Sequence, residues 1–170
     1  MMMHRIFFIL VLALVPAQAL ASSQPEALGA QGAWSGYTFT ENKQKVCYLT
    51  GIPKTSEGDY TKRGDVFLFI THYPGSNVFD DLYFDMGYPL NKGAEGKVTV
   101  SKQSFSLVGD DTHLFSEDRK QDRKIISALK QGDLLVVQSA SQKGTKTTDT
   151  FDLKGFLKIY QAISKACKKP

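Results

Sequence analysis

Short apolar segments that alternate with turn residues dominate this chain from Trp34 to Leu153. Residues 34–40 and 45–52 are rich in aromatic and β-branched side chains, which favour strands. Later segments show apolar residues at every second position, which is typical of a strand with one buried face. They lie around residues 82–86, 98–100, 105–107, 134–139 and 146–153. We therefore expect a mainly β fold.

One segment differs from this alternation. Residues 66–70 read Val-Phe-Leu-Phe-Ile and are apolar at every position, which is typical of a strand covered on both faces. The preceding residues 54–64 are charged and polar and are expected to form a loop. We interpret 66–70 as the central strand of a β-sandwich.

Two segments change to the helical period. In residues 118–131, Ile125, Ile126 and Leu129 fall on one face, and Gly132 follows as a C-terminal cap signal. Near the C-terminus, apolar residues recur at spacings of three and four, namely Phe156, Ile159, Tyr160, Ile163 and Cys167. We expect a short surface helix near 118–131 and a C-terminal helix that packs on the sheet.

The N-terminus has the order of a secretory signal peptide. Arg5 precedes an apolar run over residues 6–15, and Ala19 and Ala21 fit the small positions that signal peptidase reads. We expect a signal peptide over residues 1–21, a flexible leader over 22–32 and one domain over 33–170. The protein would then be located in the periplasm, at the outer membrane or outside the cell.

The two cysteines, Cys47 and Cys167, both follow the expected cleavage site. An exported protein with an even number of cysteines usually oxidises them, so we predict a structural disulfide between Cys47 and Cys167. The alternative is a pair of buried free thiols. The net charge of +4 is too small to indicate a nucleic-acid partner.

Several motifs resemble one known family. They are Arg63-Gly64-Asp65-Val66 with Thr71-His72-Tyr73-Pro74, Gly87-Tyr88-Pro89-Leu90, the helical segment Asp122 to Gly132, and the long stretch from Gly144 to Phe156. Together they are similar to the invasion-associated locus B (IalB) family over essentially all of the expected domain. The resemblance implies an exported protein of Gram-negative bacteria with an immunoglobulin-like β-sandwich. One departure is His113-Leu114-Phe115, where a small residue and a tryptophan are expected.

Catalytic groups are scarce in this sequence. His72 and His113 are the only imidazoles after the expected cleavage site, and we expect both to have surface or packing roles. Asp80-Asp81 and Asp110-Asp111 lack the alternating oxygen ligands and glycine turn of a calcium loop, and Gly144-Thr145-Lys146 lacks a phosphate-binding glycine loop. We therefore predict no catalytic residue, no metal and no cofactor.

Three further features have two interpretations each. Arg63-Gly64-Asp65 is the tripeptide of integrin-binding loops, although a turn before the 66–70 strand explains it more simply. The lysines near the C-terminus either complement a helix dipole or contact anionic lipid. Several aromatic residues either pack in the core or line a groove for peptide or glycan: Trp34, Tyr37, Phe39, Tyr48, Tyr73, Tyr83 and Tyr88.

The function expected from these observations is binding. We expect a non-catalytic exported protein that contacts an unknown envelope or host-surface component, with no integral membrane segment after cleavage. A periplasmic hydrolase of envelope polymers, with carboxylates as acid and base, is the alternative from another class. A structural or stress-protective envelope protein is the third possibility.

Overall fold

The structure is a computed structural model that describes residues 24–170. The expected signal peptide, residues 1–21, lies outside the described residues. The elements follow the order β1 (Glu26–Gln31), β2 (Trp34–Glu41), β3 (Gln44–Gly51), β4 (Thr55–Gly58), β5 (Phe67–Tyr73), a 3-10 turn (Pro74–Ser76), β6 (Val78–Asp85), β7 (Glu95–Val100), β8 (Gln103–Asp110), β9 (His113–Phe115), α1 (Arg119–Leu129), β10 (Leu134–Ala140), β11 (Lys146–Asp152) and α2 (Phe156–Ala166).

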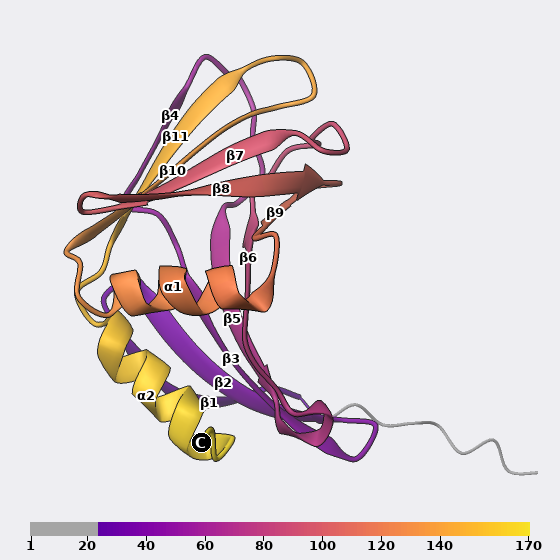
Figure 1. The fold of residues 1–170 in the computed structure, drawn as a ribbon, viewed down its shortest axis with the longest axis vertical. Coiled ribbons are helices and arrows are strands. Elements are labelled where there is room, and N and C mark those ends of the chain that lie inside the picture. The colour runs from indigo at the N-terminus through magenta and orange to yellow at the C-terminus, as the bar shows by residue number, and fades with distance from the viewer. Residues whose placement is uncertain (1–23) are drawn as a thin grey trace, which may run out of the picture.

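All eleven strands form one antiparallel sheet with the order β1-β2-β3-β5-β6-β9-β8-β7-β10-β11-β4. Figure 1 shows that this sheet bends strongly, so that β1, β2, β3 and β5 form one arm and β4, β11, β10, β7 and β8 form the other. The mainly β fold with two helices is confirmed. One bent sheet supplies both layers, whereas an immunoglobulin-like sandwich has two separate sheets.

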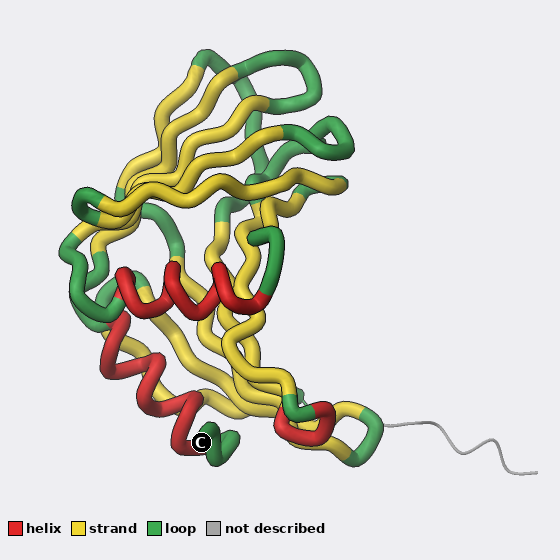
Figure 2. The backbone as a smooth tube through the Cα atoms, viewed as in Figure 1, coloured by secondary structure: helices red, strands yellow, loops and turns green. Residues whose placement is uncertain are grey.

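The helices fill the concave side of the bend (Figures 1 and 2). α1 lies across the opening between the arms and packs on β6, β7 and β8, with Ile125, Ile126 and Leu129 buried as its periodicity predicted. α2 packs on β1, β2 and β3 through the expected apolar stripe. No helix within residues 24–170 has the length and apolar character needed to cross a membrane.

The core joins the two arms of the sheet. Trp34 of β2 is fully buried and packs edge-to-face on Phe156 of α2, with ring centroids 5.1 Å apart. It also reaches β11: its ring lies 6.3 Å from that of Phe151, and its Nε1–H donates to the carbonyl of Asp152 at 2.9 Å. A single side chain therefore connects the first arm to the second.

Two segments expected to be irregular form strands at the edges of the sheet. The prediction of a flexible leader is wrong for Glu26–Gln31, which form β1 and pair with β2. The expected loop 54–64 contains β4, Thr55–Gly58, which pairs with β11. Across both segments Thr55 is the one β-branched residue and there is no aromatic residue, so pairing with a neighbour, a tertiary interaction, determines their conformation.

Candidate functional site

The outer face of the first arm and of the adjoining strands β6 and β9 carries a continuous group of half-exposed aromatic side chains. In β2, Gly36 faces Ile159 and Ile163 of α2, so the alternation of the strand turns Tyr37 and Phe39 to the opposite face. The same alternation in β3, β5, β6 and β9 adds the other members. We call the set the aromatic face: Tyr37, Phe39, Tyr48, Phe67, Phe69, Tyr73, Tyr83, His113 and Phe115.

Strand pairing brings the rings of the aromatic face into contact across five strands. Tyr37 and Tyr48 stack with centroids 5.2 Å apart, and Phe69 and Tyr83 stack at 4.9 Å. Tyr48 lies 6.4 Å from Phe69, and Tyr83 lies 6.1 Å from Phe115. The rings thus form an unbroken row from β2 to β9, each within the range of a favourable aromatic pair.

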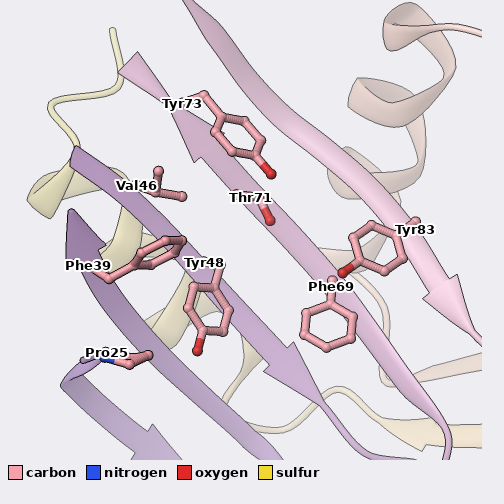
Figure 3. Close-up of a pocket in the computed structure, with 8 residues that line it drawn as sticks. All are labelled: Pro25, Phe39, Val46, Tyr48, Phe69, Thr71, Tyr73 and Tyr83. Carbon is pink, nitrogen blue, oxygen red and sulfur yellow. The ribbon is translucent and has the colours of Figure 1, made fainter. Parts of the chain in front are cut away.

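A shallow hollow of about 340 Å³ lies at the centre of the aromatic face. Figure 3 shows the rings of Tyr48, Phe69 and Tyr83 in a row over neighbouring strands, with Tyr73 and Thr71 beside them. The lining residues are Pro25, Phe39, Val46, Tyr48, Phe69, Thr71, Tyr73 and Tyr83. This arrangement can hold an apolar ligand surface by stacking and offers phenol hydroxyls as polar contacts.

The charged groups among these rings are mainly acidic. Burial raises the pKa of the Asp81 carboxyl, and the Arg119 guanidinium partly opposes that rise. Burial also raises the pKa values of Tyr73 and Tyr83, with nearby carboxylates adding to the effect. The phenols therefore stay neutral at physiological pH and act as hydrogen-bond donors.

The structure divides the aromatic residues that the sequence singled out. Tyr37, Phe39, Tyr48, Tyr73 and Tyr83 lie on the outer face, and all of them except Tyr37 line the hollow. The other two lie elsewhere, because Trp34 is in the core and Tyr88 hydrogen-bonds the Thr147 hydroxyl at 2.7 Å.

Sequence reasoning missed the role of Phe67 and Phe69 on this face. The prediction that both faces of the 66–70 strand are covered is wrong, because Phe67 and Phe69 are half-exposed while Leu68 and Ile70 are buried. A strand that is apolar at every position looks the same whether its second face is covered by protein or free to bind. The aromatic residues at alternate positions were the signal that could have found this face.

Arg63 and Asp149 form a buried ion pair at the second arm. The guanidinium donates from both terminal nitrogens to the two carboxylate oxygens at 2.8 Å each, and its Nε–H donates to the carbonyl of Met86 at 2.8 Å. The Arg63 side chain is only 4% exposed and that of Asp149 is fully buried. The ring of Tyr88 lies 4.6 Å from the guanidinium carbon, on which it exerts a cation–π attraction.

This ion pair decides between the two interpretations of Arg63-Gly64-Asp65. Gly64 N–H donates to the carbonyl of Gly87 at 2.9 Å, and a Cβ on Gly87, whose φ is +66°, would lie 2.4 Å from the Gly64 oxygen. The backbone at Gly64 is therefore closely packed against Gly87, and the Arg63 guanidinium is bound to Asp149. An integrin-type loop needs a free arginine, so the segment is a structural element that leads into β5, with no turn at residues 62–66.

His72 is fully buried beneath the C-terminal end of α2. Its Nδ1 accepts the backbone N–H of Asp80 at 3.1 Å, so the ring proton is on Nε2, which faces the Ser164 hydroxyl at 3.2 Å. Burial lowers the pKa of His72 to about 4, against the opposing effect of the Asp80 carboxylate. A neutral imidazole that donates to a serine cannot take the proton of that serine, so this is not a nucleophile–base pair.

The same end of α2 carries a second set of buried polar contacts. Tyr160 donates from its hydroxyl to Asp80 at 2.6 Å, and Lys169 binds both Asp80 and the Tyr160 hydroxyl. The ammonium of the partly buried Lys169 is thus held by these two contacts, whereas Lys165 lies in the last turn of α2, where its charge complements the helix dipole. These contacts fix the C-terminal end of the chain.

The other candidate ligands and bases lie apart. His113 belongs to the aromatic face, 5.2 Å from the ring of Tyr83. Asp80 is buried and Asp81 is half-buried, while Asp110 and Asp111 lie at the exposed β8–β9 turn. Within residues 24–170, no group of three or more His, Cys, Asp or Glu side chains is placed to hold a metal ion.

We expect His72 and Asp122 to give opposite pH dependences of stability. Burial raises the pKa of Asp122 on α1 to about 6, although its hydrogen bond with Ser116 opposes the rise. Between pH 6.5 and 4 the unfolded chain protonates His72 before the native chain does, which lowers the free energy of unfolding as pH falls. Between pH 6 and 3.8 the native chain protonates Asp122 before the unfolded chain does, which raises the free energy of unfolding as pH falls.

Two variants separate these effects. In Asp122→Asn the His72 effect remains, so the free energy of unfolding should fall more steeply from pH 6.5 to 4 than in the unmodified chain, by up to about 1.4 kcal/mol per pH unit. In His72→Gln the Asp122 effect remains, so the free energy of unfolding should fall less steeply, or rise, over the same pH range than in the unmodified chain. Urea denaturation at half-unit pH steps measures both, and parallel curves for the two variants would contradict the assignment.

The sulfur atoms of Cys47 in β3 and Cys167 at the C-terminal end of α2 lie 2.08 Å apart, the distance of a disulfide bond. Their Cα atoms are 5.9 Å apart, and both side chains are buried. The pair therefore connects α2 to the sheet directly behind the aromatic face.

Comparison with known proteins gives a family. Residues 34–164 match the family described as Invasion associated locus B (IalB) protein. No curated protein and no solved structure matches the chain. The matched segment runs from Trp34 at the start of β2 to Ser164 in α2, and so includes the aromatic face, the Arg63–Asp149 pair and the His72 site. The chain therefore belongs to the invasion associated locus B (IalB) protein family.

Proposed function

We propose that this chain is an exported, non-catalytic binding protein of the cell envelope that holds its partner on the aromatic face. The observation that carries the proposal is the row of half-exposed rings across β2, β3, β5, β6 and β9. A contiguous apolar surface of this kind is costly to leave in water and marks an interaction site in soluble domains. The partner is an envelope or host-surface component.

Export is supported by the sequence and by the cysteines. The order of charge, apolar run and small residues before Ser22 is that of a signal peptide. Cys47 and Cys167 lie at disulfide distance, which suits the oxidising periplasm or extracellular space.

The non-catalytic part of the proposal is supported by the hydrogen bonds of the histidines. His72 is a neutral donor to Ser164 and is buried away from the aromatic face, and His113 packs among rings. Turnover of an envelope polymer that is lost in His72→Gln, in a variant that still folds, would contradict this part.

Site-specific photo-crosslinking in cells tests the binding surface. Benzoylphenylalanine replaces Phe115, which is 40% exposed on the aromatic face, or Leu157, which is 43% exposed on α2 on the other side of the sheet. We expect a saturable crosslinked species from position 115 and only weak, non-saturable background from position 157. Equal crosslinking at the two positions, or none at position 115, would contradict the proposal.

A further inference from the structure

The aromatic face presents rings in a row that is set by the strands beneath them. Tyr37, Tyr48, Phe69 and Tyr83 come from four neighbouring strands, and consecutive centroids are 4.9 to 6.4 Å apart. Figure 3 shows Phe69 and Tyr83 turned toward the viewer, with their rings over the ribbon rather than behind it. Such a row can stack on successive flat apolar surfaces of a long ligand, each about one sugar ring in length.

Polar groups lie between these rings on the same face. Thr71 lines the hollow (Figure 3). Asp81 and Asp85 lie two positions before and after Tyr83 in β6, so they share its outer face. One oxygen of Asp85 accepts the backbone N–H of Gly87 at 3.1 Å, and the carboxylate has a second oxygen. Carboxylates accept strong hydrogen bonds from hydroxyl groups, and neutral phenols both donate and accept. A ligand that fits this face must combine apolar C–H surfaces with many hydroxyl groups.

The charges on the face limit the ligand further. The carboxylates of Glu41, Asp81 and Asp85 act on Tyr73 and Tyr83, while Arg119 is the basic group that acts on Asp81. Like charges across an interface are strongly unfavourable, so an anionic lipid headgroup or phosphate is disfavoured on this surface. A ligand without negative charge, such as a neutral one, meets no such penalty.

Strand pairing occupies the backbone beneath the row of rings. β3 and β5 each pair with a strand on both sides, and β6 pairs with β5 on one side and with β9 over Tyr83–Asp85 on the other. The rings of Tyr48, Phe69 and Tyr83 therefore lie over backbone that is already hydrogen-bonded within the sheet, and a ligand on these rings is recognised by side chains.

We propose that the aromatic face binds a neutral, hydroxyl-rich glycan chain, whose sugar rings stack on Tyr48, Phe69 and Tyr83 while their hydroxyl groups bond to Asp81 and Asp85. This inference rests on the proposed function, because it names the chemical class of the partner that the aromatic face holds. Stacking supplies most of the affinity, and the carboxylates orient the chain.

Titration calorimetry of the mature chain with two neutral oligosaccharides tests the inference. The ligands are the β-linked hexasaccharide of N-acetylglucosamine and α-linked maltoheptaose. We expect at least one to bind, and expect Tyr48→Leu and Phe69→Leu each to weaken that binding at least about tenfold, because a leucine keeps apolar volume but cannot stack on a sugar ring. The matched control is Tyr60→Leu, since Tyr60 lies beside Arg63 and outside the aromatic face; this variant should bind like the unmodified chain.

Far-ultraviolet circular dichroism and urea midpoints confirm that each variant folds before its affinity is compared.

Oligosaccharide binding and the crosslink at position 115 together separate failure of this inference from failure of the proposed function. If neither oligosaccharide binds at millimolar concentration while position 115 still gives a crosslink that proteases digest, the glycan is wrong and the binding surface stands. If position 115 gives no saturable crosslink, both fail. Binding that is unaffected by Tyr48→Leu and Phe69→Leu would also overturn the inference.

Discussion

Replacing Cys47 and Cys167 together with alanine should lower the free energy of unfolding by about 5 kcal/mol, the largest effect that we expect of any substitution in this chain. The two cysteines are 120 residues apart, so a disulfide between them closes a loop over most of the described chain. In the chain-entropy account, such a loop restricts the unfolded state and leaves the native state unchanged. Alanine avoids placing a polar group in the buried site.

Urea denaturation of the double variant beside the oxidised and the reduced unmodified chain measures this effect. The reduced chain should match the double variant, because both lack the covalent link while only one keeps the thiols. A non-reducing digest that recovers the Cys47 and Cys167 peptides joined establishes the bond itself. If oxidised and reduced chains unfold at the same urea concentration, the cysteines are free thiols and the prediction is wrong.

Removing one partner of the Arg63–Asp149 pair should destabilise the fold by about 3 to 5 kcal/mol. Asp149→Leu leaves a buried guanidinium without its carboxylate, and Arg63→Met leaves a fully buried carboxylate without its cation. The double variant removes both charges and should be more stable than either single variant, because no unpaired charge remains. Chemical denaturation of the unmodified chain, the two single variants and the double variant gives the coupling energy between Arg63 and Asp149.

The chain contains a second, exposed ion pair that serves as a control for this double-mutant comparison. Lys54 and Asp152 form an ion pair with a 3.9 Å separation, and their side chains are 64% and 42% exposed. Lys54→Met should change the free energy of unfolding by less than about 1 kcal/mol, because solvent screens an exposed pair. If Asp149→Leu costs as little as Lys54→Met, the burial of the Arg63–Asp149 pair contributes nothing to stability.

The Arg63–Asp149 ion pair also concerns the host-cell adhesion that the family name suggests. A tripeptide that looks like an adhesion motif in sequence is a buried structural element in three dimensions, because the Arg63 side chain is directed inward by Asp149, Met86 and Tyr88. Any contact with a host surface would have to use other residues. The aromatic face, on the opposite arm of the sheet, supplies them in our proposal.

Local pattern was sufficient for most elements of the fold. The content of aromatic and β-branched residues predicted β2 and β3, and the three-and-four spacing predicted α1 and α2 together with the faces they bury. Strands with only weak intrinsic preference were missed, as β1 and β4 show. Such segments become strands because a neighbouring edge supplies hydrogen bonds, and the sequence of the segment does not record that neighbour.

The candidate site, too, has features that the local sequence indicates and features that depend on long-range packing. Periodicity and composition are local properties, and they were enough to indicate that this chain is mainly β, that its two cysteines are a candidate pair, and that tyrosines recur along its strands. Long-range packing was needed to establish that one sheet bends into two arms, that Phe67 and Phe69 are half-exposed, and that Arg63 binds Asp149, 86 positions further along the chain. These outcomes depend on which distant surfaces cover a given face, and burial is a property of the packed molecule.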